Sequence, residues 1–518
     1  MPTVKDLQQQ IKLLRAENKA LKGSTSSSFF NRMLEQTDSA HKLRQNNVPY
    51  FVEDQKLSLL KDGEPTTTLI EGDNLSVLLG LEYKYASQVD FIYIDPPYNT
   101  GKNVYTYSDN YNYSGYKRTN NIKDDSHSSW LSFMEPRLVL GKDMLRETGI
   151  IMVAVGTREQ AHLKLLMDDV FGEENLIAIL SSEGMLKNNA KFVSVSNEYS
   201  LIYAKDIKAL KAHNVEWRTV KPSGKFLLNK AKEAWVESGE DAKKATLLLR
   251  KFYRTIEAKE IFNSEPGLKM YNNIDDNGRV YRAGDLSSPS NKGGRYEVVN
   301  PLTNHAVTVP KRGWVHSEKT FHKMIEDELI LWNRDNGVPS YKRFLDENLQ
   351  IVLSDVVRRD RDAPNRLLQK IIGRDKFTFP KDHFLISEWI EYVIPDFRKR
   401  DIENPPLVLD FFAGSGTTAH AVAYLNAQNN YNCECILVTN NENNIPSTVT
   451  QPRLKALFTG KWFSENREPL PGQLIYLKTK YSTAKVEPKT NWDLIPYSLD
   501  YVNFVKSKIQ NFKQSFYL

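Results

Sequence analysis

Short runs of apolar residues alternate with amphipathic, helix-like stretches in two separate parts of the chain. The runs in the first part, residues 29–205, are 68–70, 91–94, 150–155 and 200–204; those in the second part are 407–412 and 435–438. Buried strands that helices cover on both faces are apolar along most of their length. The pattern therefore predicts an α/β fold with one largely parallel sheet that is built from both parts.

Residues 206–350 interrupt this rhythm. The stretch begins with a basic segment and continues with many Gly, Pro, Ser and aromatic residues, so we expect a separate domain inserted between the two parts of the sheet. Between Lys208 and Glu260 there are 13 basic and 7 acidic residues, a surplus that equals the net charge of +6 of the whole chain. A local surplus of this kind suits contacts with DNA phosphates, and a solvated helical face is the alternative. The residues expected to contact DNA are Lys221, Lys225, Lys230, Lys243, Lys244 and Arg250.

The first 22 residues carry a heptad pattern, with seam positions at alternating spacings of three and four. These positions are Val4, Leu7, Ile11, Leu14, Asn18 and Leu21. An Asn on the seam favours a fixed register in a two-stranded coiled coil, so the pattern predicts a homodimer. An amphipathic helix folded back on its own domain is the alternative. Residues 23–28, GSTSSS, are expected to be a flexible linker.

The composition is that of a soluble globular protein, with 40% hydrophobic and 26% charged residues. There is neither a run of about 18 apolar residues nor an apolar signal segment near the N-terminus, so we expect no membrane association and a cytoplasmic location. The chain's two cysteines, Cys433 and Cys435, lie two positions apart in an apolar stretch, and neither a disulfide nor a metal site is expected from them. Residues 446–518 form a basic, aromatic-rich segment with a helix predicted at about 499–512.

The apolar run 91–94 is followed directly by Asp95, Pro96, Pro97 and Tyr98. Two prolines fix φ and remove two backbone donors, so we expect a stiff loop with free carbonyl acceptors at the carboxyl end of a strand. The Asp95 carboxylate and the Pro96 carbonyl can each accept one N–H of an exocyclic amine, and Tyr98 can stack on a base rotated out of the helix. An ordinary Pro-Pro turn is the alternative. The tetrapeptide is therefore the predicted catalytic loop.

A second candidate site follows the run 407–412, which continues into a glycine turn that opens a helix. Its residues are Asp410, Phe412, Gly414, Gly416 and Thr417. Glycines let the backbone approach a ligand closely, and a helix N-terminus offers unpaired N–H groups to a carboxylate or phosphate. Glu442, just past the next apolar run, has the usual position of an acid that binds ribose hydroxyls. Because the chain contains no Gly-x4-Gly-Lys-Ser/Thr sequence, an adenosyl ligand with a carboxylate fits better than ATP or GTP.

These two motifs, with the acidic one first, resemble the amino-methylating DNA methyltransferases of the permuted β class. Other segments look like the modification subunits of type III restriction systems and their solitary relatives: GDNL at 72–75, the stretch 95–101, WLSFMEPRL at 130–138, VFGE at 170–173 and NEY at 197–199. The resemblance covers roughly residues 29–205 and 340–445. It fails at Gly156 to Glu159, where relatives typically have a run of acidic residues.

The resemblance implies a Rossmann-like sheet, with a catalytic half at 29–205, a target-recognition domain at 206–350 and an S-adenosylmethionine-binding half at 351–445. It implies that Asp95, Pro96 and Tyr98 hold a flipped adenine. The cofactor residues that it implies, together with those of the glycine turn, are Asp73, Phe379, Lys381 and Glu442. For Asp73, a surface turn is the alternative.

The resulting hypothesis is transfer of a methyl group from S-adenosylmethionine to N6 of adenine in a specific double-stranded DNA sequence. Positioning and charge stabilisation would account for most of the rate, so neither a covalent intermediate nor a metal is expected. A cytosine-N4 or RNA methyltransferase, or a catalytically idle DNA-recognition subunit, is the alternative; Asp95 favours adenine, because relatives that act on cytosine N4 usually carry Ser there. The implied partners are double-stranded DNA, a second copy of the chain and a separate nuclease or helicase subunit.

Overall fold

The computed structural model describes residues 48–99, 103–104, 107–108, 126–183, 191–213, 215–220, 222–262, 265–358, 360, 362–394, 404–482, 495 and 498–515. They form two compact units. The first combines the described residues up to Glu216 with those from Ser354 on, and the second is Trp217–Leu353. The heptads predicted at 1–22 and the linker at 23–28 lie outside the described residues. Within the ranges given above, no helix is long and apolar enough to cross a membrane.

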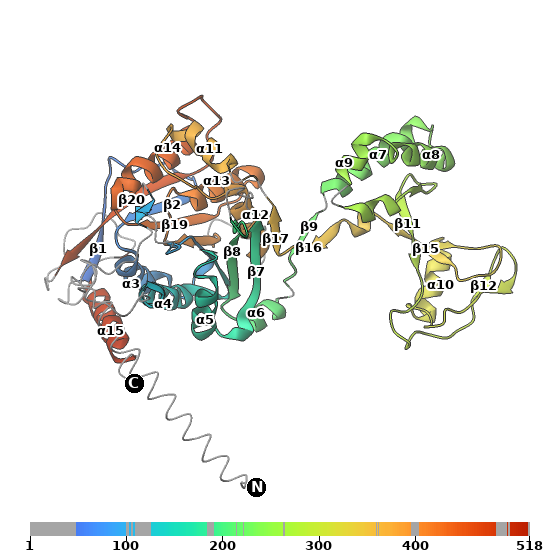
Figure 1. Cartoon of the computed structure of the whole chain (residues 1–518), viewed down its shortest axis with the longest axis horizontal. Helices are drawn as coiled ribbons and strands as arrows, with labels where there is room; N and C mark the ends of the chain where they lie inside the picture. The colour runs from blue at the N-terminus through green and yellow to red at the C-terminus, as the bar shows by residue number, and fades with distance from the viewer. Residues whose placement is uncertain are drawn as a thin grey trace, which may run out of the picture. The chain divides into compact units, whose positions relative to one another are not determined.

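The first unit is built on a ten-stranded sheet with the strand order β1-β20-β2-β19-β18-β3-β6-β8-β7-β17 (Figure 1). The strands are β1 Val48–Glu53, β2 Thr66–Glu71, β3 Val89–Ile94, β6 Leu145–Gly156, β7 Leu176–Glu183, β8 Glu198–Ala204, β17 Val356–Arg358, β18 Leu407–Asp410, β19 Glu434–Thr439 and β20 Gln473–Ser482. All neighbours from β20 to β6 are parallel, whereas β1 and β8 run antiparallel to theirs. The predicted α/β fold with a largely parallel sheet is confirmed.

The two parts of the sequence meet in the middle of this sheet. β18, from the second part, lies between β19 and β3, and its residues Val408 and Leu409 pair with Phe91 and Ile92 of β3. These four side chains are completely buried, as expected for central strands that are apolar on both faces. The carboxyl ends of β3 and β18 therefore leave the sheet at the same edge, side by side.

Helices cover both faces of the sheet (Figure 1). One face carries α3 Asn74–Tyr85, α4 Ser126–Met144, α5 Gln160–Phe171 and α15 Leu499–Ser515, and the other carries α11 Ala363–Ile372, α12 His383–Val393, α13 Thr417–Asn429 and α14 Gln451–Thr459. The main core lies between the sheet and the first layer, where Trp130, Met134 and Leu138 of α4 pack on alternate residues of β3, β6 and β18. A short α6, Ile207–Ala212, follows β8, and β4 Asn103–Val104 pairs with β5 Tyr107–Ser108.

The C-terminal segment adds elements to the first unit that the sequence reasoning did not assign. β20 occupies a place within the sheet, between β1 and β2, and α14 packs against it and against α11. The helix predicted at about 499–512 is observed as α15, where Tyr501 and Val505 are buried in the main core. This segment is therefore an integral part of the first unit.

The second unit contains two small cores. Helices α7 Pro222–Glu237, α8 Ala242–Phe252 and α9 Ile256–Ile261 enclose the first, which includes Leu227, Leu249 and Phe262. The second is centred on Trp314 and Phe321, the latter on α10 Glu318–Glu326. The remaining strands are β9 Arg218–Val220, β10 Asn273–Ile274, β11 Val280–Asp285, β12 Val299–Asn300, β13 His305–Ala306, β14 Ile330–Leu331, β15 Ser340–Phe344 and β16 Gln350–Val352. Four of them form one sheet in the order β10-β11-β15-β14.

Candidate active site

The predicted catalytic loop leaves the carboxyl end of β3. Tyr98 donates a hydrogen bond from its hydroxyl to Asp95 Oδ1 over 2.7 Å, and Lys381 Nζ donates to the Tyr98 hydroxyl over 2.6 Å. The same ammonium lies 3.4 Å from Asp95 Oδ1 and donates to Glu198 Oε2 over 2.8 Å. The structure therefore joins Asp95, Tyr98, Lys381 and Glu198 in one cluster, with one cation shared by two carboxylates.

The protonation states in this cluster follow from burial and from the shared lysine. Burial raises the pKa of Asp95, the Lys381 ammonium partly offsets this, and the Glu198 charge adds to the rise. Burial lowers the pKa of Lys381, but the charges of Asp95 and Glu198 outweigh that effect and raise it overall. Burial, together with both carboxylates, holds the pKa of Tyr98 well above its ordinary value. Lys381 is therefore a cation and Tyr98 a hydrogen-bond donor at neutral pH.

Three neighbours support the loop from behind. Trp130 of α4 donates from Nε1 to the Pro97 carbonyl over 2.6 Å, which uses a carbonyl that the prolines leave free. Gly156, at the end of β6, lies under the Tyr98 ring, where an added Cβ would come within 3.1 Å of the ring. Asn99 has a φ of 55° and donates from its side chain to Glu159 Oε1 over 2.7 Å. Buried groups therefore hold the second half of the loop, from Pro97 to Asn99.

The glycine turn leaves the neighbouring strand β18. Gly414 and Gly416 have φ values of 48° and 76°, a region in which residues with a Cβ are strained. Asp410 accepts hydrogen bonds from the Phe412 backbone N–H over 2.9 Å and from the Thr418 hydroxyl over 2.6 Å. Burial raises the pKa of Asp410 to about 7, against the lowering effect of these two hydrogen bonds. The contacts of Asp410 shape the turn, and its predicted role as a cofactor ligand stays a prediction.

Two residues of the C-terminal segment, Thr450 and Arg453, also hold the turn. Thr450, the last residue of a π-helical turn at Pro446–Thr450, donates from its hydroxyl to the Gly414 carbonyl over 2.7 Å. Arg453 is 1% exposed and contacts the Ser415 carbonyl at 3.2 Å and the Thr417 hydroxyl at 3.0 Å. Burial lowers the pKa of Arg453 to about 9. Neither residue could be predicted from the sequence, because both lie more than 30 positions after the turn that they support.

The GDNL segment supports the start of the glycine turn. Asn74 donates from its side chain to the Phe411 carbonyl over 2.9 Å and accepts from Arg137 Nε over 2.6 Å. Asp73 caps α3 through the Ser76 N–H and lies 3.5 Å from Arg137 Nη2. The Arg137 guanidinium also stacks 3.7 Å from the centre of the Phe133 ring, which packs on Phe412. This network ties α3 and α4 to the start of the glycine turn.

The other predicted cofactor residues lie around the same edge of the sheet. Glu442 is half-buried in a short helical turn after β19. Phe379 is 79% exposed and has a φ of 58°. Thr417 is the buried first residue of α13. Lys381 was predicted beside the cofactor, and its observed contacts are with the catalytic loop and Glu198. The roles of these residues in binding a cofactor stay predictions.

The basic residues predicted to bind DNA belong to the second unit, apart from Lys221, which lies outside the described residues. Lys225, Lys243 and Lys244 are exposed on α7 and α8. Lys230 is partly engaged, since it contacts Glu233 at 2.9 Å. Arg250 donates to the Asn272 carbonyl over 3.1 Å. The exposed members have the positive charge that a phosphate contact requires, and their role in DNA binding stays a prediction.

The fold and the two loops define the class of the protein: an α/β enzyme whose acidic Pro-Pro-aromatic loop and glycine turn lie on adjacent strands. Comparison with known proteins gives the family. A family model described as DNA methylase, of the N6/N4 methyltransferase type, matches residues 89–445. The chain belongs to this DNA methylase family.

Two relatives illustrate the match. The chain is 31% identical over 405 residues to the type II methyltransferase M.KpnI of Klebsiella pneumoniae, with 76% of this chain and 84% of that protein covered. It is 30% identical over 391 residues to the Mod subunit of the type III restriction-modification enzyme EcoP15I of Escherichia coli, with 71% of this chain and 58% of that subunit covered. The chain thus spans somewhat more than half the length of that Mod subunit. Among solved structures, the cytosine-N4-specific PvuII DNA methyltransferase is 10% identical, with 87% of this chain and 97% of that chain covered and a TM-score of 0.34.

Proposed function

We propose that this protein transfers the methyl group of S-adenosylmethionine to N6 of a flipped-out adenine in a specific sequence of double-stranded DNA. The observation that carries the proposal is the contact of Lys381, which lies just before α12, with Asp95 and Tyr98 of the catalytic loop beside the glycine turn. Membership of the DNA methylase family supports it. Asp95 in the first position of the tetrapeptide favours adenine over cytosine as the substrate base.

The catalytic loop can hold an amino group in a reactive geometry. The Asp95 carboxylate accepts one N–H of the adenine amine, and the Pro96 carbonyl accepts the other, so that the nitrogen lone pair points away from the ring plane. The Lys381 ammonium favours the ionised form of Asp95, and in that form the carboxylate can take up the proton that the amine loses after it has gained the methyl group. The Tyr98 ring, whose hydroxyl is fixed at 2.7 Å from Asp95, is suited to stack on the base.

The glycine turn is suited to S-adenosylmethionine, which would supply an electrophilic methyl group on its sulfonium. Gly414 and Gly416 leave the backbone open at the N-terminus of α13, where unpaired N–H groups and the helix dipole favour a carboxylate. The buried charge of Arg453 behind the turn adds to this positive potential. We assign the ribose to Glu442 at the end of β19, and we assign the remaining surface of the cofactor to Asp73 and Phe379.

Sequence recognition and assembly are further parts of the proposal. We assign target recognition to the second unit, in which Lys225, Lys243 and Lys244 would contact phosphates. Because EcoP15I Mod is named as a subunit of a restriction-modification enzyme, we propose that this chain modifies DNA in such a system together with a separate restriction subunit. Residues 1–22 would join two copies of the chain, and a cytoplasmic location would give the enzyme access to the chromosome.

The proposal is tested with the full-length protein, unmethylated plasmid DNA and S-adenosylmethionine that carries a labelled methyl group. We expect label in N6-methyladenine after digestion to nucleosides and mass spectrometry, and none with the Asp95→Ala variant. Single-molecule sequencing of the same DNA should find the modified adenines in one sequence context. Label in N4-methylcytosine, label only in RNA added as a competitor, or cofactor binding without transfer to any nucleic acid would each contradict the proposal.

A further inference from the structure

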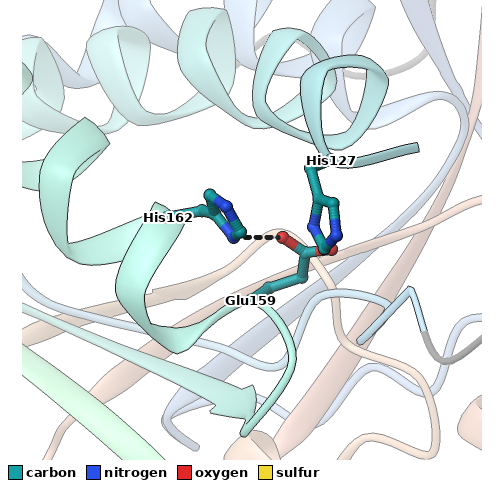
Figure 2. Close-up of side chains that lie close together, drawn as sticks. All are labelled: His127, Glu159 and His162. Atoms are coloured by element: carbon teal, nitrogen blue, oxygen red, sulfur yellow. Dashed lines mark ion pairs between the residues drawn. The ribbon is translucent and has the colours of Figure 1, made fainter. Parts of the chain in front are cut away.

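Two histidines and a glutamate converge behind the catalytic loop. Figure 2 shows His127 and His162 pointing toward the carboxylate of Glu159 from two different helices. His127 is the second residue of α4, His162 is the third residue of α5, and Glu159 directly precedes α5. One ligand atom of each lies within 4.8 Å of the others, and among the described residues this is the one group of three His, Cys, Asp or Glu side chains with that geometry.

The distances suit a bound transition metal. His127 Nδ1 lies 2.8 Å from Glu159 Oε1, and His162 Nδ1 lies 3.3 Å from Glu159 Oε2. Zinc binds nitrogen and oxygen ligands at about 2.0–2.2 Å with tetrahedral angles, which separates two ligand atoms by roughly 3.3 Å. Small side-chain movements therefore suffice to bring all three groups onto one ion.

The hydrogen bonding leaves ligand atoms of the cluster available. Neither imidazole Nδ1, nor Glu159 Oε2, has a partner in hydrogen-bonding geometry among the described residues. The 2.8 Å between His127 Nδ1 and Glu159 Oε1 is a short contact, but it lacks the angles of a hydrogen bond. Glu159 also makes no capping bond with α5, although it occupies the N-cap position. Its carboxylate is instead directed to the two imidazoles and to Asn99.

The charge of Glu159 requires compensation. Its side chain is completely buried, and burial of a carboxylate without a counter-charge is costly. The Arg158 Nε is 3.9 Å away, but the Arg158 side chain is 42% exposed, so solvent screens its charge. The histidine side chains are 25% and 41% exposed, which leaves a path for an ion from solvent.

We propose that His127, Glu159 and His162 bind a divalent transition-metal ion, with zinc as the first candidate. Two imidazoles and one carboxylate form a zinc ligand set, and they select such ions over magnesium and calcium, which prefer ligand sets made of oxygen. A water molecule would complete the coordination. Asn99, which donates to Glu159 over 2.7 Å, is the outer partner that orients the carboxylate.

At this position the ion would stabilise the contact between two helices. It would join the start of α4 to the start of α5, and through Asn99 it would fix the residue that follows Tyr98 of the catalytic loop. No metal site was expected from the sequence, because the two cysteines lack the spacing of metal ligands. The cluster escaped notice because His127 lies 32 positions before Glu159, and only the packing of α4 on α5 unites them.

The test measures zinc binding to full-length protein from which metal has been removed with a chelator. In competition with a chromophoric chelator, we expect the wild type to bind one equivalent. His127→Ala, His162→Ala and Glu159→Gln should each weaken binding by about 100-fold or more, and Asn99→Ala by about 10- to 100-fold as an outer partner. The matched control is His322→Ala, which removes an exposed histidine 4.0 Å from Glu318 in another helix and should leave binding unchanged.

A second measurement distinguishes loss of metal binding from unfolding of a variant. Cobalt should give the absorption bands of a four-coordinate site in the wild type, and zinc should raise the melting temperature of the wild type but not that of His162→Ala, whose half-exposed side chain can be removed without opening the core. Wild-type binding no tighter than that of folded His162→Ala would overturn the proposal. The cluster would then be a carboxylate–imidazole contact with no metal.

Discussion

Replacement of Lys381 by Met should shift the acid side of the pH–rate profile to higher pH. Lys381 Nζ lies 3.4 Å from Asp95 Oδ1 and lowers the pKa of that carboxyl, which burial and Glu198 raise. At 3.4 Å the Coulomb attraction is about 1 kcal/mol at the dielectric constant of water and about 5 kcal/mol at an effective value of about 20. Both side chains keep solvent contact, at 21% and 28% exposure, so solvent screens the attraction and the value of about 1 kcal/mol applies.

The direction of this shift in the pH–rate profile follows from the protonation state of Asp95 that the adenine amine requires. Only the ionised Asp95 accepts an N–H in this way and takes up the proton after transfer, so activity falls as pH drops through the pKa of Asp95. Without the ammonium that pKa rises further, and the variant should lose activity at a pH where the wild type is still active. A loss of about 1 kcal/mol of this attraction corresponds to a rate about fivefold lower at a pH below the pKa of Asp95. The rate should recover when the pH is raised.

The assay is single-turnover methyl transfer to a short DNA duplex between pH 5.5 and 9, with cofactor at saturation. Glu198→Gln provides a test of opposite sign: the negative charge of Glu198 raises the pKa of Asp95, so its removal should move the acid limb to lower pH. Lys376→Met, an exposed lysine of the same segment, is the matched control and should change nothing. Identical acid limbs in the wild type and Lys381→Met would refute the role of Lys381 in holding Asp95 ionised.

Three further outcomes are expected. Asp95→Ala should abolish methyl transfer and keep cofactor affinity, whereas Gly416→Asp should abolish cofactor binding, because its new side chain would meet Thr450 within 2.9 Å. Calorimetric titration of the cofactor separates the two variants, and an equal loss of cofactor affinity in both would contradict the division of roles. Arg453→Met should lower the free energy of unfolding in urea by roughly 3 kcal/mol and weaken cofactor binding, because buried acceptors on the turn lose their donor. The control Arg467→Met, at an exposed arginine, should cause no measurable change. Neutralising Lys225, Lys243 and Lys244 together should reduce the slope of DNA affinity against salt by up to about 2.7, and an unchanged slope would make these residues a solvated face.

The parts of the active site that could be predicted are those in which one short segment specifies its own conformation. Asp95 to Tyr98 carries two prolines and follows an apolar strand, and Gly414 and Gly416 occupy backbone conformations that favour glycine. The alternation of apolar runs and helices also gave the α/β fold, because parallel strands buried on both faces have a recognisable composition. Each of these signals is local.

The supporting residues could not be predicted, because distance along the chain carries no information about distance in space. Arg453 and Thr450 reach the glycine turn from a segment whose π-helical turn has no sequence signature. β20 contains the apolar run 474–477, but nothing in that run specifies its place in the sheet between β1 and β2. Glu198 was noted only as part of a similar segment, since its relation to Lys381 depends on the pairing of β8 with β6.

The arrangement of charges around the two loops argues for a division of labour between the halves of the sheet. On the β3 side, a cation is shared between Asp95 and Glu198, so the electrostatic state of the loop responds to any group that approaches the carboxylate. On the β18 side, the charge of Arg453 is buried among neutral acceptors and cannot be screened by solvent. The β3 side, whose charges respond to an approaching group, suits a base that enters and leaves at each turnover. The β18 side, whose charge is buried, suits a charged cofactor that must bind in one orientation. If this is correct, added salt should weaken the effect of Lys381→Met on the rate far more than the effect of Arg453→Met on cofactor affinity.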